Sequence, residues 1–158
     1  MISAVDVSSI AEKLKTCSTH KEVYSLVVQE ISEALSLSRC IFVPTDSGSH
    51  APVEWSNGLE GSEERDRLLV ELVYYLQDIC RSVSGLITIH DVNDSKLLRP
   101  LESHVKTLEV ASILACPISS VEAPGASLIL IQEEESRIWR DEEKNLLLSL
   151  RPFIIDAL

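Results

Sequence analysis

The sequence is poor in aromatic residues and in basic residues. It holds two Trp, three Tyr and two Phe among 158 residues, and 14 Lys and Arg stand against 25 Asp and Glu, for a formal charge of −11 at pH 7. Nucleic-acid sites need a positive surface, and sites for single strands add aromatic platforms on which bases stack. Anionic membrane surfaces also repel an acidic chain. We therefore expect no nucleic-acid partner and no membrane partner.

Long apolar segments are missing as well. The longest uninterrupted apolar runs have about five residues, whereas a membrane-spanning helix needs roughly 20. The first residues, Met-Ile-Ser-Ala-Val-Asp, lack both the basic region and the apolar region of a secretory signal. These absences predict a cytoplasmic protein, or one of the plastid stroma if the source is a plant or an alga.

Paired metal-binding cysteines are the third absence. Cys17, Cys40, Cys80 and Cys116 are far apart, and none forms a CxxC or CxxH pair. A structural zinc site usually takes two ligands from one short turn, so this spacing argues against zinc. In a reducing compartment such residues are normally free thiols that pack as small hydrophobic side chains. A metal would need thiols from distant segments to converge.

What the sequence does contain is a regular succession of helix-like and strand-like segments. Its hydrophobic fraction of 45% predicts a folded globule, and its length is most simply one domain, residues 1–158. From periodicity and turn residues we predict helices near 7–17, 19–35, 62–83, 100–108 and 141–158, and strands near 39–44, 51–55, 86–90, 111–118 and 126–132. This order is typical of an α+β domain with a mainly antiparallel sheet.

Three helix starts carry capping signals. Ser9 and Glu12 have the spacing of a capping box, and Thr19 and Glu22 repeat it. Asp141 can accept hydrogen bonds from the first free backbone amides of the last helix. We expect a helix to begin at each of these positions.

The last helix is apolar over more of its circumference than packing on one sheet requires. Leu147, Leu150 and Ile154 form one seam, and Leu146 and Phe153 belong to an overlapping one. We expect a homodimer in which the first and last helices form a bundle with those of another subunit. The alternative is that these two helices pack on each other within one chain. Because the periodic pattern is still running at the final residue, we also expect the helix to continue into a further, output domain.

The element order and three segments together resemble the GAF family over nearly the whole chain. The segments are Leu86–Val92, Ala111–Ile118 and the ending, in which a strand leads through Arg137, Trp139 and Glu143 into the last helix. The ending is most similar to GAF domains of cyanobacterial and chloroplast-type sensor histidine kinases and bilin-binding photoreceptors. The resemblance implies a sheet of about six antiparallel strands, with the N- and C-terminal helices on one face and pocket helices and loops on the other.

By that resemblance the pocket would be lined by 62–83, by 90–108 and by the inner face of the sheet. The candidate ligand residues there are His90, Asp91 and His104. A His–carboxylate pair at a strand end can bind a polar ligand or respond to pH, and the alternative is a solvated strand terminus.

The resemblance raises two possible cofactors, a covalently attached bilin and an iron–sulfur cluster. Bilin-binding relatives carry a Cys-His pair where this chain has Pro100 and Leu101, so we expect no covalent bilin. Chloroplast-type sensor kinases have a comparable domain thought to sense redox state, sometimes through an iron–sulfur cluster. Such clusters require soft sulfur ligands, so the four cysteines are the candidate cofactor residues if their thiolates converge.

The sequence therefore predicts a regulatory module and no enzyme, because nucleophile–base pairs and metal-spaced ligands are missing. We expect a sensory module of a signal-transduction protein, a sensor histidine kinase of a two-component system, that relays a small-ligand or redox signal through a dimeric C-terminal helix. The alternatives are a cysteine-based redox sensor with an iron–sulfur cluster, and a dimerisation module whose pocket is degenerate.

Overall fold

The computed structural model describes residues 4–44, 52–56, 63–83, 85–118 and 125–158. Two helices come first, α1 (Ala4–Lys15) and α2 (His20–Leu35), followed by strands β1 (Arg39–Val43) and β2 (Val53–Ser56). The long helix α3 (Glu63–Arg81), strand β3 (Ile87–Ile89), two 3₁₀ turns η1 (Val92–Asp94) and η2 (Lys96–Leu101), and the short helix α4 (Glu102–Thr107) come next. Strands β4 (Val110–Pro117) and β5 (Ser127–Glu133) then lead to α5 (Asp141–Ala157). The predicted α+β order is confirmed.

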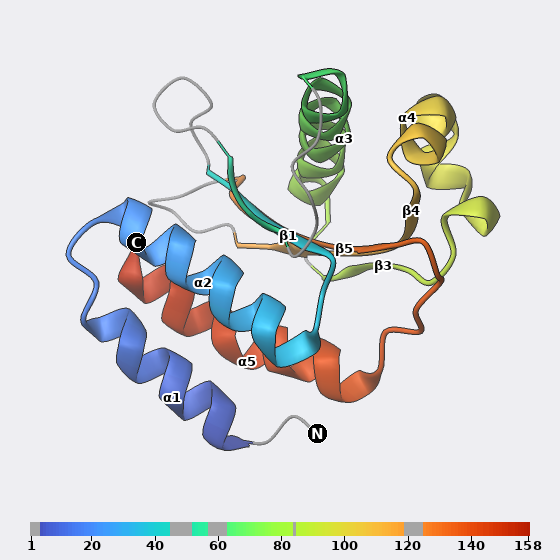
Figure 1. Cartoon of the computed structure of the whole chain (residues 1–158). Helices are drawn as coiled ribbons and strands as arrows, with labels where there is room; N and C mark the ends of the chain where they lie inside the picture. Colours follow the sequence, from blue (N-terminus) through green and yellow to red (C-terminus); the bar gives the residue numbers. More distant parts are fainter. Residues whose placement is uncertain (1–3, 45–51, 57–62, 84, 119–124) are drawn as a thin grey trace.

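The strands of the described residues form one antiparallel sheet in the order β2-β1-β5-β4-β3. It has five strands, one fewer than the resemblance implied. Helices α1, α2 and α5 lie on one face, and α3 and α4 lie on the other (Figure 1). Because side chains alternate across a strand, Phe42 and Leu130 pack toward α2 and α5, while Ile41 and Ile129 pack toward α3. Both faces are covered, which explains why β1 and β4 are buried along their whole length.

The capping signals have different outcomes. Thr19 is the N-cap of α2, and its hydroxyl accepts a hydrogen bond from the Glu22 amide at 3.2 Å, as predicted. The prediction for Ser9 is wrong, because α1 already begins at Ala4 and Ser9 lies inside it. The prediction for Asp141 is also wrong by one residue: Asp141 is the first helical residue of α5.

The N-terminus of α5 is held by Glu143 instead. Its carboxylate accepts a hydrogen bond from the backbone amide of the N-cap residue Arg140 at 2.9 Å. It also pairs with the guanidinium of Arg137. The helix starts one residue earlier than an aspartate cap would place it, because the third residue of the helix supplies the carboxylate.

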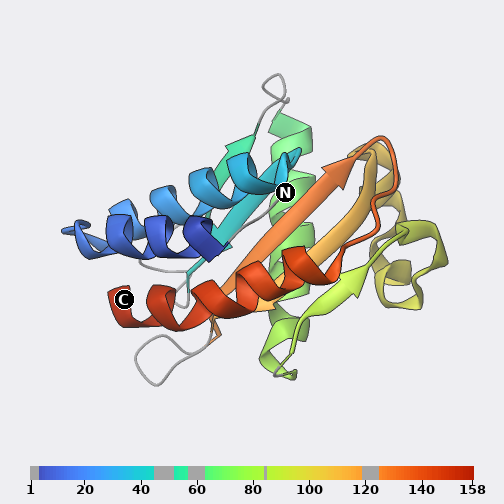
Figure 2. The same ribbon diagram turned by 90° about the horizontal axis from the view of Figure 1, so that it is seen from below.

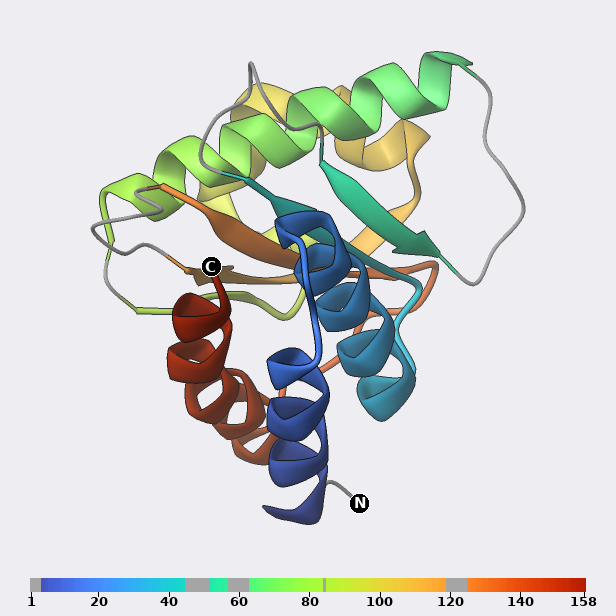
Figure 3. The ribbon, with the colours of Figure 1, turned by 90° about the vertical axis from the view of Figure 1, so that its left-hand side faces the viewer.

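Most of the apolar circumference of α5 is covered within the chain. Leu146, Leu147, Leu150 and Ile154 are buried, and α5 packs between the sheet and α1, alongside α2 (Figures 2 and 3). The first and last helices therefore do contact each other within one chain. Phe153 remains 41% exposed and Leu148 39% exposed. Whether a second subunit covers them stays a prediction. None of the described helices is long and apolar enough to cross a membrane.

Candidate functional site

The side of the sheet that faces α3 is packed with apolar side chains. This is where the resemblance places a ligand pocket. The buried residues come from α3, η1, η2, α4 and four of the strands: Ile41, Val43, Leu69, Leu72, Val73, Leu76, Cys80, Ile89, Val92, Leu98, Val105, Leu108, Val110, Ile113, Ala115, Ile129 and Ile131. Such a layer holds α3 and α4 on the sheet by burial of apolar surface. A ligand between α3 and the sheet would have to displace it.

Hollows occur instead on the outside of this layer, around η1. One hollow of about 230 Å³ lies between η1, η2 and α4, and a second of about 430 Å³ runs from η1 to Ser136. They share Val92, Asn93, Val105 and Lys106, and we call them together the η1 groove. Val92, Leu98 and Val105 give the groove an apolar part, and most of its other lining residues are polar or charged.

Charged side chains of both signs surround the η1 groove. Lys96 and Arg99 project from η2 at the first hollow, and neither has an ion pair with another described residue. Lys106 pairs with Glu102 at 3.1 Å. This lining suits a small polar ligand, with Lys96 and Arg99 as its unpaired cations.

The second hollow is bordered by two turns with left-handed backbone. Glu109 has a φ of 58° and Glu134 a φ of 69°, a conformation that costs free energy for residues other than glycine. The Glu134 amide donates to the Glu109 carbonyl at 2.9 Å, so the two turns support each other. Ser136, at the end of this hollow, directly precedes the turn into α5.

That turn is fastened to the end of β3 beside the groove. The indole Nε1–H of Trp139 donates to the Ile89 carbonyl at 3.1 Å, and the Trp139 amide donates to His90 Nδ1 at 3.0 Å. The hydroxyl of Ser112 donates to the His90 carbonyl at 2.5 Å and accepts from the Arg137 amide at 2.6 Å. The Arg137 guanidinium also lies 5.0 Å from the centre of the Trp139 ring. One set of bonds thus joins the β3–η1 corner to the start of α5.

The three predicted ligand residues are not brought together. His90 points to the α5 side of the sheet, where it holds Trp139, and so it does not face α3 as predicted. Ile89 faces α3, and the next residue of an extended chain must face the opposite way. Asp91 caps η1 by accepting from the Asn93 amide at 2.9 Å. His104 pairs through Nε2 with Glu71 of α3, outside the η1 groove.

The four cysteines lie on different sides of the sheet. Cys40 and Cys116 belong to the cluster under α2 and α5, Cys80 belongs to the cluster under α3, and Cys17 follows α1. In the part of the chain that the structure describes, no group of three or more His, Cys, Asp or Glu side chains could hold a metal ion. These thiols therefore do not fit an iron–sulfur cluster.

Burial also keeps these thiols protonated. It raises the pKa of Cys80 to about 11 and that of Cys116 to about 12. It raises the pKa of Cys40 still further. Because the thiolate is the form that binds metals and reacts with oxidants, these three side chains are suited to packing.

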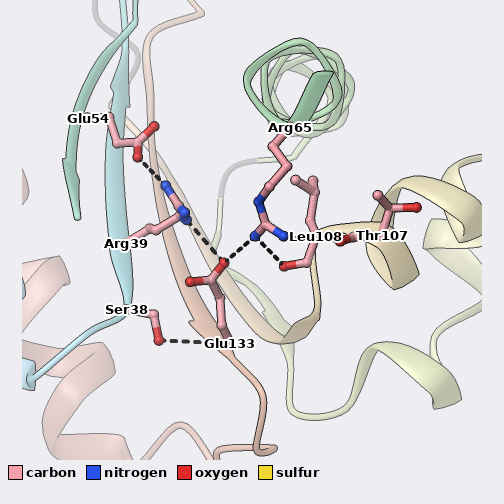
Figure 4. Close-up of polar contacts among 7 residues, drawn as sticks. All are labelled: Ser38, Arg39, Glu54, Arg65, Thr107, Leu108 and Glu133. Carbon is pink, nitrogen blue, oxygen red and sulfur yellow. Dashed lines mark hydrogen bonds and ion pairs between the residues drawn. The ribbon is translucent and has the colours of Figure 1, made fainter. Parts of the chain in front are cut away.

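A network of four charged residues closes the end of the α3 layer (Figure 4). Arg39 of β1 pairs with Glu54 of β2 and donates through Nε to Glu133 of β5 at 3.1 Å. Arg65 of α3 lies 3.5 Å from the same Glu133 oxygen and donates to the Leu108 carbonyl at 3.3 Å. The network ties three strands to α3 and to the end of α4.

The electrostatics of this network are balanced, with two cations and two anions. Burial raises the pKa of Glu54, and the guanidinium of Arg39 only partly opposes that shift. Burial lowers the pKa of Arg39, but Glu133 and Glu54 outweigh this and leave it raised. Each charge has a partner in the protein, so the network serves to hold elements together.

Neither this network nor the role of Gln77 is predicted by the sequence. Gln77 is 2% exposed in α3, and its amide nitrogen donates to the carbonyls of Pro44 and Gly125, each at 3.0 Å. It thereby holds the end of β1 and the start of β5 against α3. A signal was present: Gln77 lies one residue after the inward-facing Leu76 and four after the inward-facing Val73.

Comparisons with known proteins give structural matches only. No protein-family profile matches the chain, and no curated protein sequence matches it. The GAF domain of a phosphoenolpyruvate-protein phosphotransferase from Coxiella burnetii is 17% identical, with a TM-score of 0.67, over 97% of this chain and 90% of that one. A GAF domain from Synechocystis in its photoproduct state is 15% identical, with a TM-score of 0.65, over 87% and 92%.

A third neighbour is the PixJ GAF domain of Thermosynechococcus elongatus in its blue-light absorbing form. It is 14% identical, with a TM-score of 0.61, over 99% of this chain and 89% of that one. Each of these three neighbours covers most of this chain. The layered antiparallel sheet, the helices on its two faces and these matches together identify the chain as having the GAF fold.

Proposed function

We propose that this chain is a regulatory module of a signal-transduction protein, in which a small polar ligand in the η1 groove changes the position of α5. The observation that carries the proposal is the direct bonding of the β3–η1 corner to the turn that starts α5. A ligand that binds one conformation of η1 more tightly raises the population of that conformation. Because the turn that starts α5 is bonded to this corner, the population of its conformations shifts as well. Trp139, bonded to both Ile89 and His90, is the link.

The finer form of this proposal is a sensor histidine kinase module that works as a homodimer through α1 and α5. Leu148 and Phe153 on α5 are the large apolar side chains still exposed there. In such a dimer they would pack against the partner, and a change at the start of α5 would reach both subunits.

A large cofactor is the less suitable occupant. One structural neighbour is a far-red absorbing protein with bound biliverdin. In this chain Pro100 and Leu101 stand where related proteins attach the pigment, and the α3 layer is filled by its own side chains. The proposal therefore rests on the hollows outside this layer, which fit a small molecule.

The test is amide hydrogen exchange of the whole chain with and without His90→Ala. This change removes the acceptor for the Trp139 amide. We expect exchange to accelerate by about tenfold for that amide, since one hydrogen bond is lost. We also expect faster exchange at both ends of the link: at the Ser95 amide of η1, which bonds to the Val92 carbonyl, and at the Lys144 amide of α5, which bonds to the Arg140 carbonyl.

His104→Ala is the matched control. It removes a histidine that pairs with Glu71 between α4 and α3 and has no bond to the α5 turn. We expect faster exchange in α4 and unchanged exchange in α5. If His90→Ala leaves the Lys144 amide unchanged, or if His104→Ala accelerates it equally, the proposed link between groove and helix is wrong. A dimerisation module with no ligand-linked helix would then be favoured.

A further inference from the structure

The outward side of α3 carries a stripe of mostly exposed residues. Leu69, Leu72 and Leu76 face the sheet, and on one flank Glu71 pairs with His104 and Tyr75 donates to the Leu97 carbonyl. Figure 3 shows α3 lying across the top of the molecule. The stripe on that side consists of Glu63, Arg67, Val70, Tyr74, Asp78 and Arg81. We call it the α3 stripe.

The middle of the α3 stripe is apolar and its ends are charged. Val70 is 42% exposed, which makes it one of the few large apolar side chains of this chain open to solvent. Tyr74, one turn along, is half-buried. The side chains of Asp78 and Arg81 are 72% and 51% exposed. The exposed Val70 and the half-buried Tyr74 lie between charged residues, as the apolar centre of an interface lies within a polar rim.

The order of these residues is self-complementary when the helix is reversed. Val70 and Tyr74 lie two residues on either side of Leu72, and Glu63 and Arg81 lie nine residues on either side. Arg67 lies five residues before this midpoint, and Asp78 lies six after it. Two antiparallel copies would therefore place Val70 against Tyr74, Glu63 against Arg81 and Arg67 against Asp78.

We propose that the α3 stripe is a docking surface for a second copy of this chain, with the two α3 helices antiparallel across a two-fold axis that lies outside α3, level with Leu72 along the helix. In an isologous contact every pair occurs twice, so each copy supplies both partners of each pair. The interface lies on the opposite face of the sheet from α1 and α5. It is thus distinct from the dimer considered above and does not rest on it.

Charge supports a second copy as the occupant. The chain carries a net charge of −11, so two copies repel each other over most of their surface. The α3 stripe, by contrast, has two acidic and two basic residues and no net charge, so this repulsion is absent between two stripes. Glu63 and Arg67 form no ion pair with another described residue, whereas Asp78 and Arg81 bond to each other at 3.0 Å. In the dimer these four side chains gain partners across the axis.

The contact should be weak. Helix α3 is about 27 Å long, and two helices crossing at an axial separation of about 8–10 Å bury less surface than a standard stable interface. The electrostatic part should also weaken with salt. We expect a dimer that forms at high protein concentration and low ionic strength.

Charge reversal in the whole chain tests the proposal by sedimentation equilibrium at low salt. Arg67→Glu alone, or Asp78→Arg alone, places like charges opposite each other twice per dimer. Each should lower the association constant by about tenfold. The double variant Arg67→Glu/Asp78→Arg should restore association to near the original value. Residues 67 and 78 are about 16 Å apart along one helix, so they can compensate only between copies.

The matched control is Phe153→Ser on α5, which should leave the α3 contact unchanged and weaken only a dimer through α1 and α5. Circular dichroism confirms that each variant is folded. Restoration by the double reversal supports the proposal. A chain that is monomeric throughout, a dimer that neither single reversal weakens, or a double reversal that fails to restore association would each overturn it. The hydrogen-exchange test of the α5 link is unaffected by any of these outcomes.

Discussion

Trp139 is the side chain whose change should test the structure most directly. It is 2% exposed, and it donates from Nε1 to the Ile89 carbonyl. Trp139→Phe keeps an aromatic ring but removes that donor. The buried carbonyl left without a partner costs about 1–3 kcal/mol, and the smaller ring leaves a cavity that costs about 1–2 kcal/mol. We expect a loss of about 3 kcal/mol in the free energy of unfolding. A domain of ordinary stability, about 5–15 kcal/mol, survives this loss.

Urea unfolding followed by circular dichroism measures the effect. The matched control is the neighbouring Ile138, which is 75% exposed, so Ile138→Ala should change stability by no more than about 0.5 kcal/mol. The bond geometry also predicts that the Lys144 amide of α5 exchanges faster in Trp139→Phe and not in Ile138→Ala. A loss below about 1 kcal/mol for Trp139→Phe, or equal losses for both variants, would refute this account of the turn.

Four other predictions follow from polar side chains and thiols of the structure. Gln77→Met removes the donor that the Pro44 and Gly125 carbonyls share and should cost about 2–3 kcal/mol in urea unfolding, whereas Gln77→Glu should cost more because its oxygens repel those carbonyls. Arg39→Met leaves two glutamates facing each other and should cost about 3 kcal/mol, with Arg39→Lys intermediate. Because burial raises the pKa of Cys80 and Cys116, the folded state holds these protons more tightly than the unfolded state. Stability should therefore be complete below about pH 9 and fall as the pH rises toward 11 to 12, and less so in Cys80→Ala. A thiol reagent at pH 8 should modify Cys17 first, and Cys17→Ser should abolish that fast phase.

The element order could be predicted because periodicity depends on which face of each element is buried. The segment Leu69–Leu76 repeats at helical spacing because only one side of α3 meets the sheet. Strands β4 and β5 read as continuous apolar runs because helices cover both faces. Thr19 was a reliable helix start because its capping bond is local and needs no tertiary partner.

The site could not be predicted to the same degree, because its bonds join segments far apart in the chain. Arg39 begins an apolar strand, and nothing in its neighbours indicates that Glu133 lies beside it, 94 residues later. His90 is predicted on the α3 face of the sheet and lies on the other face. The start of a strand decides which of its residues point to which face, and a shift of one residue turns every side chain to the opposite face. The same alternation in β1 places Cys40 on the face under α2 and α5, whereas Cys80 lies on the α3 side. The face to which Cys40 points therefore argues against a metal site shared with Cys80.

The alternation of side chains along β3 bears on the proposed link between the η1 groove on one side of the sheet and α5 on the other. Ile89 packs into the α3 layer, yet its carbonyl is the acceptor for Trp139 on the α5 side. His90 follows it with its ring toward α5, and Val92 then returns to the α3 layer as a wall of the η1 groove. Within four residues the chain thus passes from the α3 layer to the α5 side and back. A displacement of Val92 must move His90 or strain the short segment between them, and His90 is bonded to the residue that positions α5. In the proposed coupling, the backbone at the β3 edge would therefore carry the connection between the two layers.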